Sequence, residues 1–174
     1  MTMKVAVLMG SPNDQNKMAA AAATLAEFGL EPDERVMSAH RTPDDVATFA
    51  KSARQNGYAA VICGAGMAAH LAGAVAANTT LPVVGVPLSG GALNGIDALY
   101  ATVQMPKGVP VATVAVDGAA NAALLVVQML AITDQDLAAK LEERRAQARN
   151  DARGAGAPPG RGGGVGAPPG EMTQ

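Results

Sequence analysis

The chain has 174 residues, of which 49% are apolar, and its 13 basic and 15 acidic side chains give a net charge of −2. The apolar fraction excludes a chain that is disordered throughout, and the nearly balanced charge excludes a nucleic-acid-binding protein that relies on a basic surface. The first ten residues lack a signal-peptide pattern, no run of 18 apolar residues occurs, and Cys63 is the single cysteine. We therefore expect a cytoplasmic protein without a membrane segment.

Short β-rich runs alternate with helical patterns along the chain. The predicted strands cover residues 4–9, 34–37, 59–63, 83–86 and 111–116, and the predicted helices cover residues 14–28, 43–56, 68–77, 92–104, 118–132 and 134–150. Apolar strands separated by helices predict an α/β fold with a parallel sheet covered on both faces. Such sheets bind ligands beyond the carboxyl ends of their strands, so the residues after each strand are the candidate site.

The first strand is followed by a glycine and a cluster of polar residues. Ser11, Asn13 and Asp14 come directly after Gly10, at the start of a predicted helix. Hydroxyl, amide and carboxylate groups at a helix N-terminus suit a phosphate or a sugar hydroxyl, although such residues also cap helices without binding a ligand. The segment matches neither the dinucleotide fingerprint nor the Walker loop.

The second strand ends in Ser38, Ala39, His40 and Arg41, just before the helix start at 42–43. A threonine hydroxyl before a proline predicts the cap and the first position of that helix. The arginine offers a permanently charged, forked donor for phosphate, and the histidine offers a proton donor or acceptor near neutral pH. A solvent-exposed loop without a ligand is the alternative.

The third strand runs into Gly64, Ala65 and Gly66, where the backbone can approach a ligand closely. His70 follows within a segment of small residues, and both a buried structural histidine and a catalytic one remain open. Two histidines and one cysteine give no metal-ligand spacing, so no metal site is expected.

Two regions bear on organisation. The helical pattern at 121–132 is apolar on most sides and predicts packing against a second copy in a homo-oligomer. From residue 151 the sequence is rich in glycine and proline, which predicts a domain over 1–150 and a disordered tail over 151–174.

Several longer segments then become recognisable together. They read GSPND at 10–14, SAHRTPD at 38–44, GAGMAAHLAG at 64–73, LPVVGVP at 81–87 and GIDALYATVQMPKGVPVATVAV at 95–116. With these motifs, residues 4–145 resemble the PurE family, the N5-carboxyaminoimidazole ribonucleotide mutases of purine biosynthesis.

The resemblance implies a flavodoxin-like three-layer fold with a five-stranded parallel sheet and a C-terminal helix, an octamer, and no metal or organic cofactor. The implied reaction is the isomerisation of N5-carboxyaminoimidazole ribonucleotide to 4-carboxy-5-aminoimidazole ribonucleotide, by decarboxylation and recapture of CO₂. By position, His40 matches the general acid/base, Asp14 the contact to the ribose hydroxyls and Arg41 the contact to the 5′-phosphate. The other implied substrate contacts are Ser11, Asn13, Ser38, Ala39, Gly64, Ala65, Gly66 and His70.

Three positions depart from the usual family pattern. Asn13 stands where a serine is usual, Met67 replaces a glycine, and Ala72 replaces a proline. If the backbone at 67 needs a positive φ, Met67 is strained.

An arginine after His40 favours the mutases over the related direct carboxylases, which carry a lysine there. The alternative functions are a PurE-like carboxylase acting on aminoimidazole ribonucleotide or another heterocyclic ribonucleotide, and a non-catalytic module that binds a nucleotide or a flavin.

Overall fold

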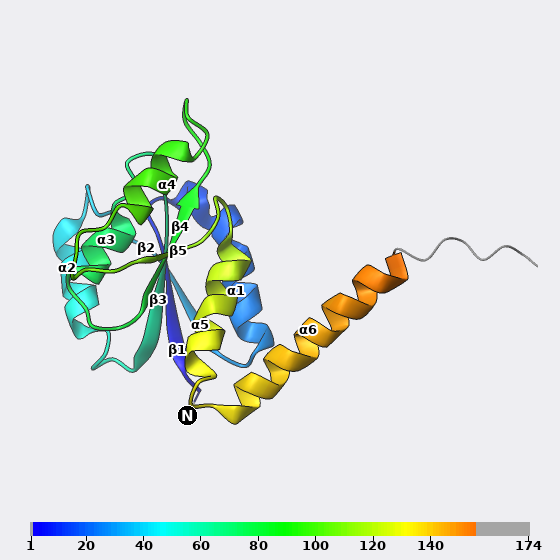
Figure 1. The fold of residues 1–174 in the computed structure, drawn as a ribbon. Helices are drawn as coiled ribbons and strands as arrows, with labels where there is room; N and C mark the ends of the chain where they lie inside the picture. The colour runs from blue at the N-terminus through cyan, green and yellow to red at the C-terminus, as the bar shows by residue number, and fades with distance from the viewer. Residues whose placement is uncertain (1, 156–174) are drawn as a thin grey trace, which may run out of the picture. The chain divides into compact units, whose positions relative to one another are not determined.

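The computed structural model describes residues 2–155, and the chain divides into two compact units, 1–140 and 141–174. Five parallel strands form the sheet of the first unit: β1 (Lys4–Met9), β2 (Glu31–Val36), β3 (Tyr58–Gly66), β4 (Val83–Leu88) and β5 (Ala112–Thr113). They lie in the order β2-β1-β3-β4-β5 (Figure 1), which is the flavodoxin-like order. The strand order reverses between β1 and β3, so a ligand site is expected at the carboxyl ends of these two strands. The predicted five-stranded parallel sheet is confirmed.

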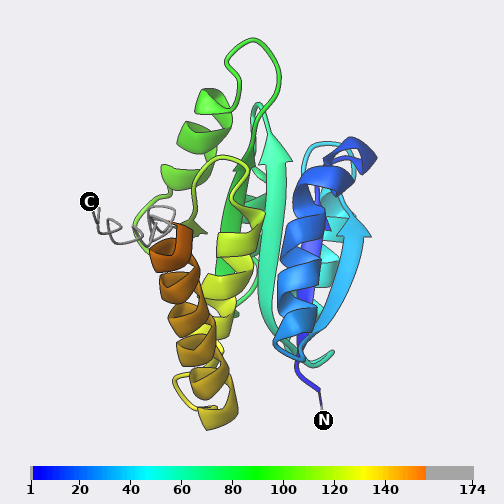
Figure 2. The same cartoon turned by 90° about the vertical axis from the view of Figure 1, so that its right-hand side faces the viewer.

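Helices cover both faces of this sheet, as Figure 1 shows. They are α1 (Gln15–Glu27), preceded by the 3₁₀ turn η1 (Pro12–Asp14), α2 (Pro43–Ser52), α3 (Leu71–Ala76), α4 (Ile96–Val103) and α5 (Ala119–Leu130). α1 packs against α5 on one face, which Figure 2 views, and α2 packs against α3 on the other. Successive side chains of β1 point to opposite faces, and Ala6 and Leu8 join the cluster that includes Phe49 and Leu71 of α2 and α3.

β3 and β5 differ in length from the prediction, because pairing with β4 sets where they end. β5, predicted over 111–116, has only two residues, because it pairs with β4 only at Val84 and Gly85. β3 continues through Gly66, because its last residues pair with the end of β4. Gly64 and Gly66, which follow the strand predicted over 59–63, are therefore part of β3.

The last helix, α6 (Gln135–Ala155), begins in the first unit and continues into the second. The carboxylate of Asp134 accepts bonds from the backbone N–H groups of Asp136 (3.0 Å) and Leu137 (3.1 Å) and so caps the start. The helix predicted over 134–150 extends to Ala155, so the first five residues of the predicted tail, 151–155, are helical. The rest of the predicted tail, 156–174, lies outside the described residues. Among the residues described, no helix combines the length and apolar character needed to span a membrane.

Candidate active site

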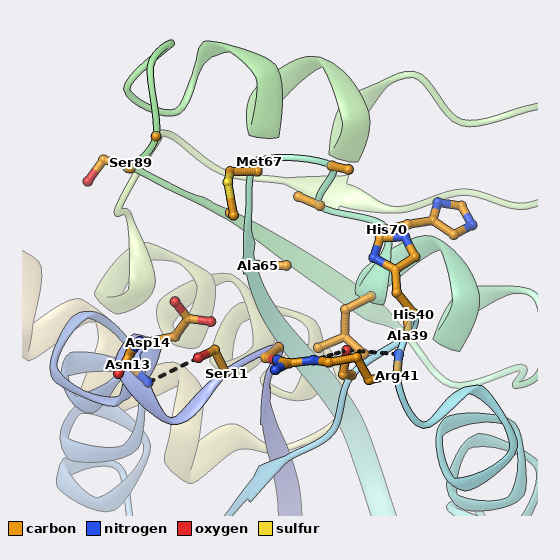
Figure 3. Close-up of a pocket in the computed structure, with 18 residues that line it drawn as sticks. Ser11, Asn13, Asp14, Ala39, His40, Arg41, Ala65, Met67, His70 and Ser89 are labelled. Carbon is orange, nitrogen blue, oxygen red and sulfur yellow. Dashed lines mark hydrogen bonds between the residues drawn. The ribbon is translucent and has the colours of Figure 1, made fainter.

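A cavity of about 640 Å³ opens at the carboxyl edge of the sheet, at the reversal of strand order. Its walls come from the end of β3 and from the segments that follow β1, β2, β3 and β4, and the lining residues are 10, 11, 13, 14, 38–41, 65–71 and 89–91. Figure 3 shows Asp14 and Ser11 on one side of the cavity, with His40 and His70 toward the opposite end. The fold thus brings three of the predicted loops, far apart in the sequence, to one pocket.

The loop after β1 presents Asp14 through a short helical turn. The Ser11 hydroxyl accepts a hydrogen bond from the backbone N–H of Asn13 (3.3 Å) and caps that turn. Partial burial raises the pKa of the Asp14 carboxyl, and the backbone N–H of Ser11 and the charges of Lys17 and Arg41 oppose this rise. All three predicted residues of this loop line the cavity.

The loop after β2 is closed on itself by side chains. The Thr42 hydroxyl accepts from the backbone N–H of Ser38 (3.1 Å) and donates to its carbonyl (3.2 Å), so it does not cap α2 as predicted. Arg41 donates through Nη2 to the Gly10 carbonyl (2.9 Å) and through Nε to the Ser38 hydroxyl (3.3 Å). These bonds engage two of the five N–H donors of the guanidinium, which leaves donors for an anionic ligand. Ser38, Ala39, His40 and Arg41 all line the cavity.

The end of β3 contributes Ala65 and Gly66 to the cavity, but not Gly64. Gly64 is buried in the strand, where its carbonyl accepts from the Gly10 N–H (3.0 Å) and a Cβ would lie 2.3 Å from the Sδ of Met18. Gly64 therefore packs against α1 and does not line the cavity in this structure, and its role as a substrate contact stays a prediction.

His70 directly precedes α3 and lines the cavity. It is exposed, so the alternative of a buried structural histidine was wrong. A Cβ on Gly73 would lie 2.8 Å from the His70 Cε1 atom, which shows that the ring lies over this glycine.

The loop after β4 is a wall that the sequence analysis missed. Ser89, Gly90 and Gly91 line the cavity. They directly follow β4, so the principle that ligands bind beyond the carboxyl ends of parallel strands would have selected them. The Ser89 backbone N–H (2.9 Å) and hydroxyl (2.5 Å) donate to the carboxylate of Asp117. Lys17 donates to the Ser89 hydroxyl (2.7 Å) and carbonyl and lies 3.8 Å from Asp117. This Lys17–Ser89–Asp117 cluster joins α1 to the loops after β4 and β5.

Metal-ligating or thiol chemistry has no support from the described part of the chain. Over residues 2–155, no group of three or more histidine, cysteine, aspartate or glutamate side chains could hold a metal ion. Burial raises the pKa of the Cys63 thiol, which keeps it protonated and unreactive.

Comparisons with known proteins show which family this chain belongs to. Residues 4–151 match the family model described as AIR carboxylase. The chain is 51% identical over 148 residues to the N5-carboxyaminoimidazole ribonucleotide mutase of Saccharolobus solfataricus, covering 85% of this chain and 94% of that one. It is 49% identical over 139 residues to the phosphoribosylaminoimidazole carboxylase of Saccharomyces cerevisiae, covering 80% of this chain and 24% of that one. The crystal structure of Treponema denticola PurE aligns with a TM-score of 0.76 and 26% identity, over 88% of this chain and 99% of that one.

Proposed function

The chain belongs to the AIR carboxylase family, and we propose that within it this protein acts as an N5-carboxyaminoimidazole ribonucleotide mutase. It is an isomerase of purine biosynthesis that moves a carboxyl group from an exocyclic nitrogen to a ring carbon. The observation that carries this function is the convergence of Asp14, from the loop after β1, with His40 and Arg41, from the loop after β2, on one cavity. It occurs in a chain that is about half identical to proteins named for this activity.

Different walls of the cavity are suited to different parts of the ribonucleotide. Arg41, with the Ser11 and Ser38 hydroxyls, would hold the 5′-phosphate, because its free donors suit a phosphate oxygen. Asp14 would accept hydrogen bonds from the ribose hydroxyls. Asn13 lies beside it on the same loop. A ribonucleotide anchored in this way directs its heterocycle toward the remaining walls.

The chemistry requires one group that both gives and takes a proton. In the proposed sequence, protonated His40 donates to the exocyclic nitrogen as the N–C bond breaks and CO₂ leaves. The ring carbon then attacks the retained CO₂, and His40 removes the proton from that carbon as the aromatic ring is restored. Protons balance over the cycle, since His40 ends as it began. Ala39, Ala65, Gly66 and His70 would surround the carboxylate and keep CO₂ near the ring.

Assembly and location are finer parts of the proposal. Ile96, Tyr100 and Val103 lie at helical spacing on α4 and are exposed in the isolated chain. An exposed apolar stripe of this kind supports a homo-oligomer, which we propose to be an octamer. A cytoplasmic location follows from the substrate, because a phosphorylated intermediate does not cross membranes unaided.

A direct carboxylase is the second candidate function, because the yeast relative is named as a carboxylase. The discriminating experiment gives the purified protein two substrates in parallel, N5-carboxyaminoimidazole ribonucleotide and aminoimidazole ribonucleotide with bicarbonate. The mutase converts the first to 4-carboxy-5-aminoimidazole ribonucleotide and leaves the second unchanged. Faster formation of the same product from the second substrate would identify a carboxylase. No product from either, together with flavin absorbance, would identify a binding module.

A further inference from the structure

Met67 adopts a backbone conformation that a residue of its size rarely takes. Its φ angle is +54°, in the left-handed region, where a Cβ atom meets the neighbouring carbonyl and only glycine is unstrained. The side chain is nevertheless 60% exposed and is not held in the core. Strain without a packing reason points to a role for the side chain at the site.

The side chain of Met67, which follows β3, reaches the loop after β4. A Cβ atom on Gly91 would lie 3.3 Å from the Cγ and 3.5 Å from the Sδ of Met67, so the methionine lies against the glycine backbone. In Figure 3 its side chain extends into the cavity between Ala65 and Ser89. Met67 therefore joins the wall after β3 to the wall after β4.

The cavity is divided between polar and apolar surfaces. Asp14, Ser11 and Arg41 supply polar groups on the loops after β1 and β2, while the residues next to Met67 in the sequence that line the cavity, from Ala65 to Ala69, carry no polar side chain. A ribonucleotide held by its ribose phosphate on the polar side presents its heterocycle to the apolar side. A flexible, polarisable thioether packs well on an aromatic face.

We propose that the Met67 side chain packs against the heterocycle of the bound ribonucleotide and determines which base the site accepts. This inference rests on the proposed function, because it takes the ligand to be an imidazole ribonucleotide. It predicts that Met67 contributes to recognition of the base and contributes nothing to recognition of the ribose phosphate.

The test compares Met67→Gly, Met67→Ala and Met67→Leu with the wild-type protein. Loss of the side chain in the glycine and alanine variants should weaken product binding and raise KM by about 5- to 50-fold, the scale of one hydrophobic contact with a ligand. Leucine preserves the apolar volume and should stay within about threefold of wild type. The Tm of Met67→Gly should exceed that of Met67→Ala by a few degrees, roughly the size expected for one relieved left-handed residue.

The second part of the test measures the binding of ribose 5-phosphate, which lacks the heterocycle. Its dissociation constant should be the same in all four proteins, and Ile132→Ala, which truncates another exposed apolar side chain, should change neither ligand's affinity. The assignment of Met67 is overturned if the glycine and alanine variants lose as much affinity for ribose 5-phosphate as for the product. It is also overturned if both of these variants bind the product with wild-type affinity. A wild-type protein that binds product but lacks turnover overturns the mutase function alone, because the binding comparison still decides the role of Met67. A wild-type protein that does not bind product overturns both.

Discussion

At the scale of single residues, the loop after β2 determines how His40 can act. The two bonds between the Thr42 hydroxyl and the Ser38 backbone close this loop, and the guanidinium of Arg41 attaches it to the Gly10 carbonyl. A histidine on a loop held in this way has a defined position relative to Arg41, the residue proposed to bind the phosphate. Placement of a proton donor before the reaction reduces the entropic cost of the catalytic step.

His40→Asn should therefore separate binding from catalysis. Asparagine retains a hydrogen-bonding group but cannot carry a proton near neutral pH, so turnover should fall by about 10²–10⁴-fold. The affinity for product, measured by calorimetry, should stay near the wild-type value because Asp14 and Arg41 are unchanged. Retention of more than about a tenth of the wild-type turnover would contradict the acid/base role and direct attention to His70.

The ionised side chain of Asp14 lowers the stability of the folded protein. Because partial burial raises the pKa of its carboxyl, the folded state binds this proton more readily than the unfolded state does. The ionised carboxylate therefore lowers stability at neutral pH, and this loss disappears as the pH falls through the folded-state pKa and below the ordinary value of 3.8.

Asp14→Asn should accordingly raise Tm at pH 7 while weakening product binding, and the gain in Tm should shrink as the pH is lowered toward the ordinary aspartate range. Thermal unfolding at several pH values measures the first effect, and calorimetry the second. Asp44→Asn is the matched control, because Asp44 is exposed in the first turn of α2 and should give no gain. An equal gain in both variants would attribute the effect to net charge.

At the scale of elements, the Lys17–Ser89–Asp117 cluster holds together three segments that the sheet alone does not join. β5 pairs with β4 over only two residues. The backbone N–H of Asp117 donates to the Pro87 carbonyl (2.9 Å), and its carboxylate accepts from Ser89. The pKa of Asp117 is lowered by the Ser89 hydrogen bonds and by the charge of Lys17, against the effect of burial. The cluster therefore positions the cavity wall formed by Ser89 and Gly91.

Lys17→Met should raise KM by about fivefold, the effect of losing one net hydrogen bond, and leave kcat within about twofold, since His40 is not disturbed. Lys17→Arg, which can still donate to Ser89, should recover most of the affinity. Lys51→Met removes another lysine at the far end of α2 and should leave KM unchanged. A larger fall in kcat than rise in KM would show that Lys17 acts on the chemical step.

At the scale of the whole molecule, the first unit leaves an apolar stripe uncovered. Ile96 and Tyr100 are 52% and 62% exposed, and they lie one turn apart on α4. α4 itself buries Ala98 and Thr102 against the sheet. The opposite face of this helix is therefore available to a second copy of the chain.

Tyr100→Glu should reduce the proposed octamer to smaller species in sedimentation velocity experiments. An unpaired carboxylate in an apolar interface costs several kcal/mol, which exceeds what one contact contributes to assembly. Gln55→Glu adds the same charge in the turn after α2, where Gln55 is exposed, and should leave the sedimentation coefficient unchanged. An unaltered coefficient for Tyr100→Glu would place the interface elsewhere on the molecule.

The sequence by itself determined the features that depend on local chemistry. The bounds of β1, the start of α2 at Pro43, and the polar loops after the first two strands follow from hydrophobic pattern and residue type over a few positions. Ser11, Asp14, His40 and Arg41 could be selected because the carboxyl ends of parallel strands share one edge of the sheet.

Only the tertiary structure decided the features that depend on distant neighbours. Pairing with β4 shortened β5 and extended β3 through Gly66, and close packing against Met18 buried Gly64 away from the cavity. The cluster around Ser89 likewise depends on a distant segment, because Lys17 lies 72 residues away from Ser89 in the sequence. A pattern within one segment carries no information about which other segment will pack against it, because that choice is made by the free energy of the whole fold.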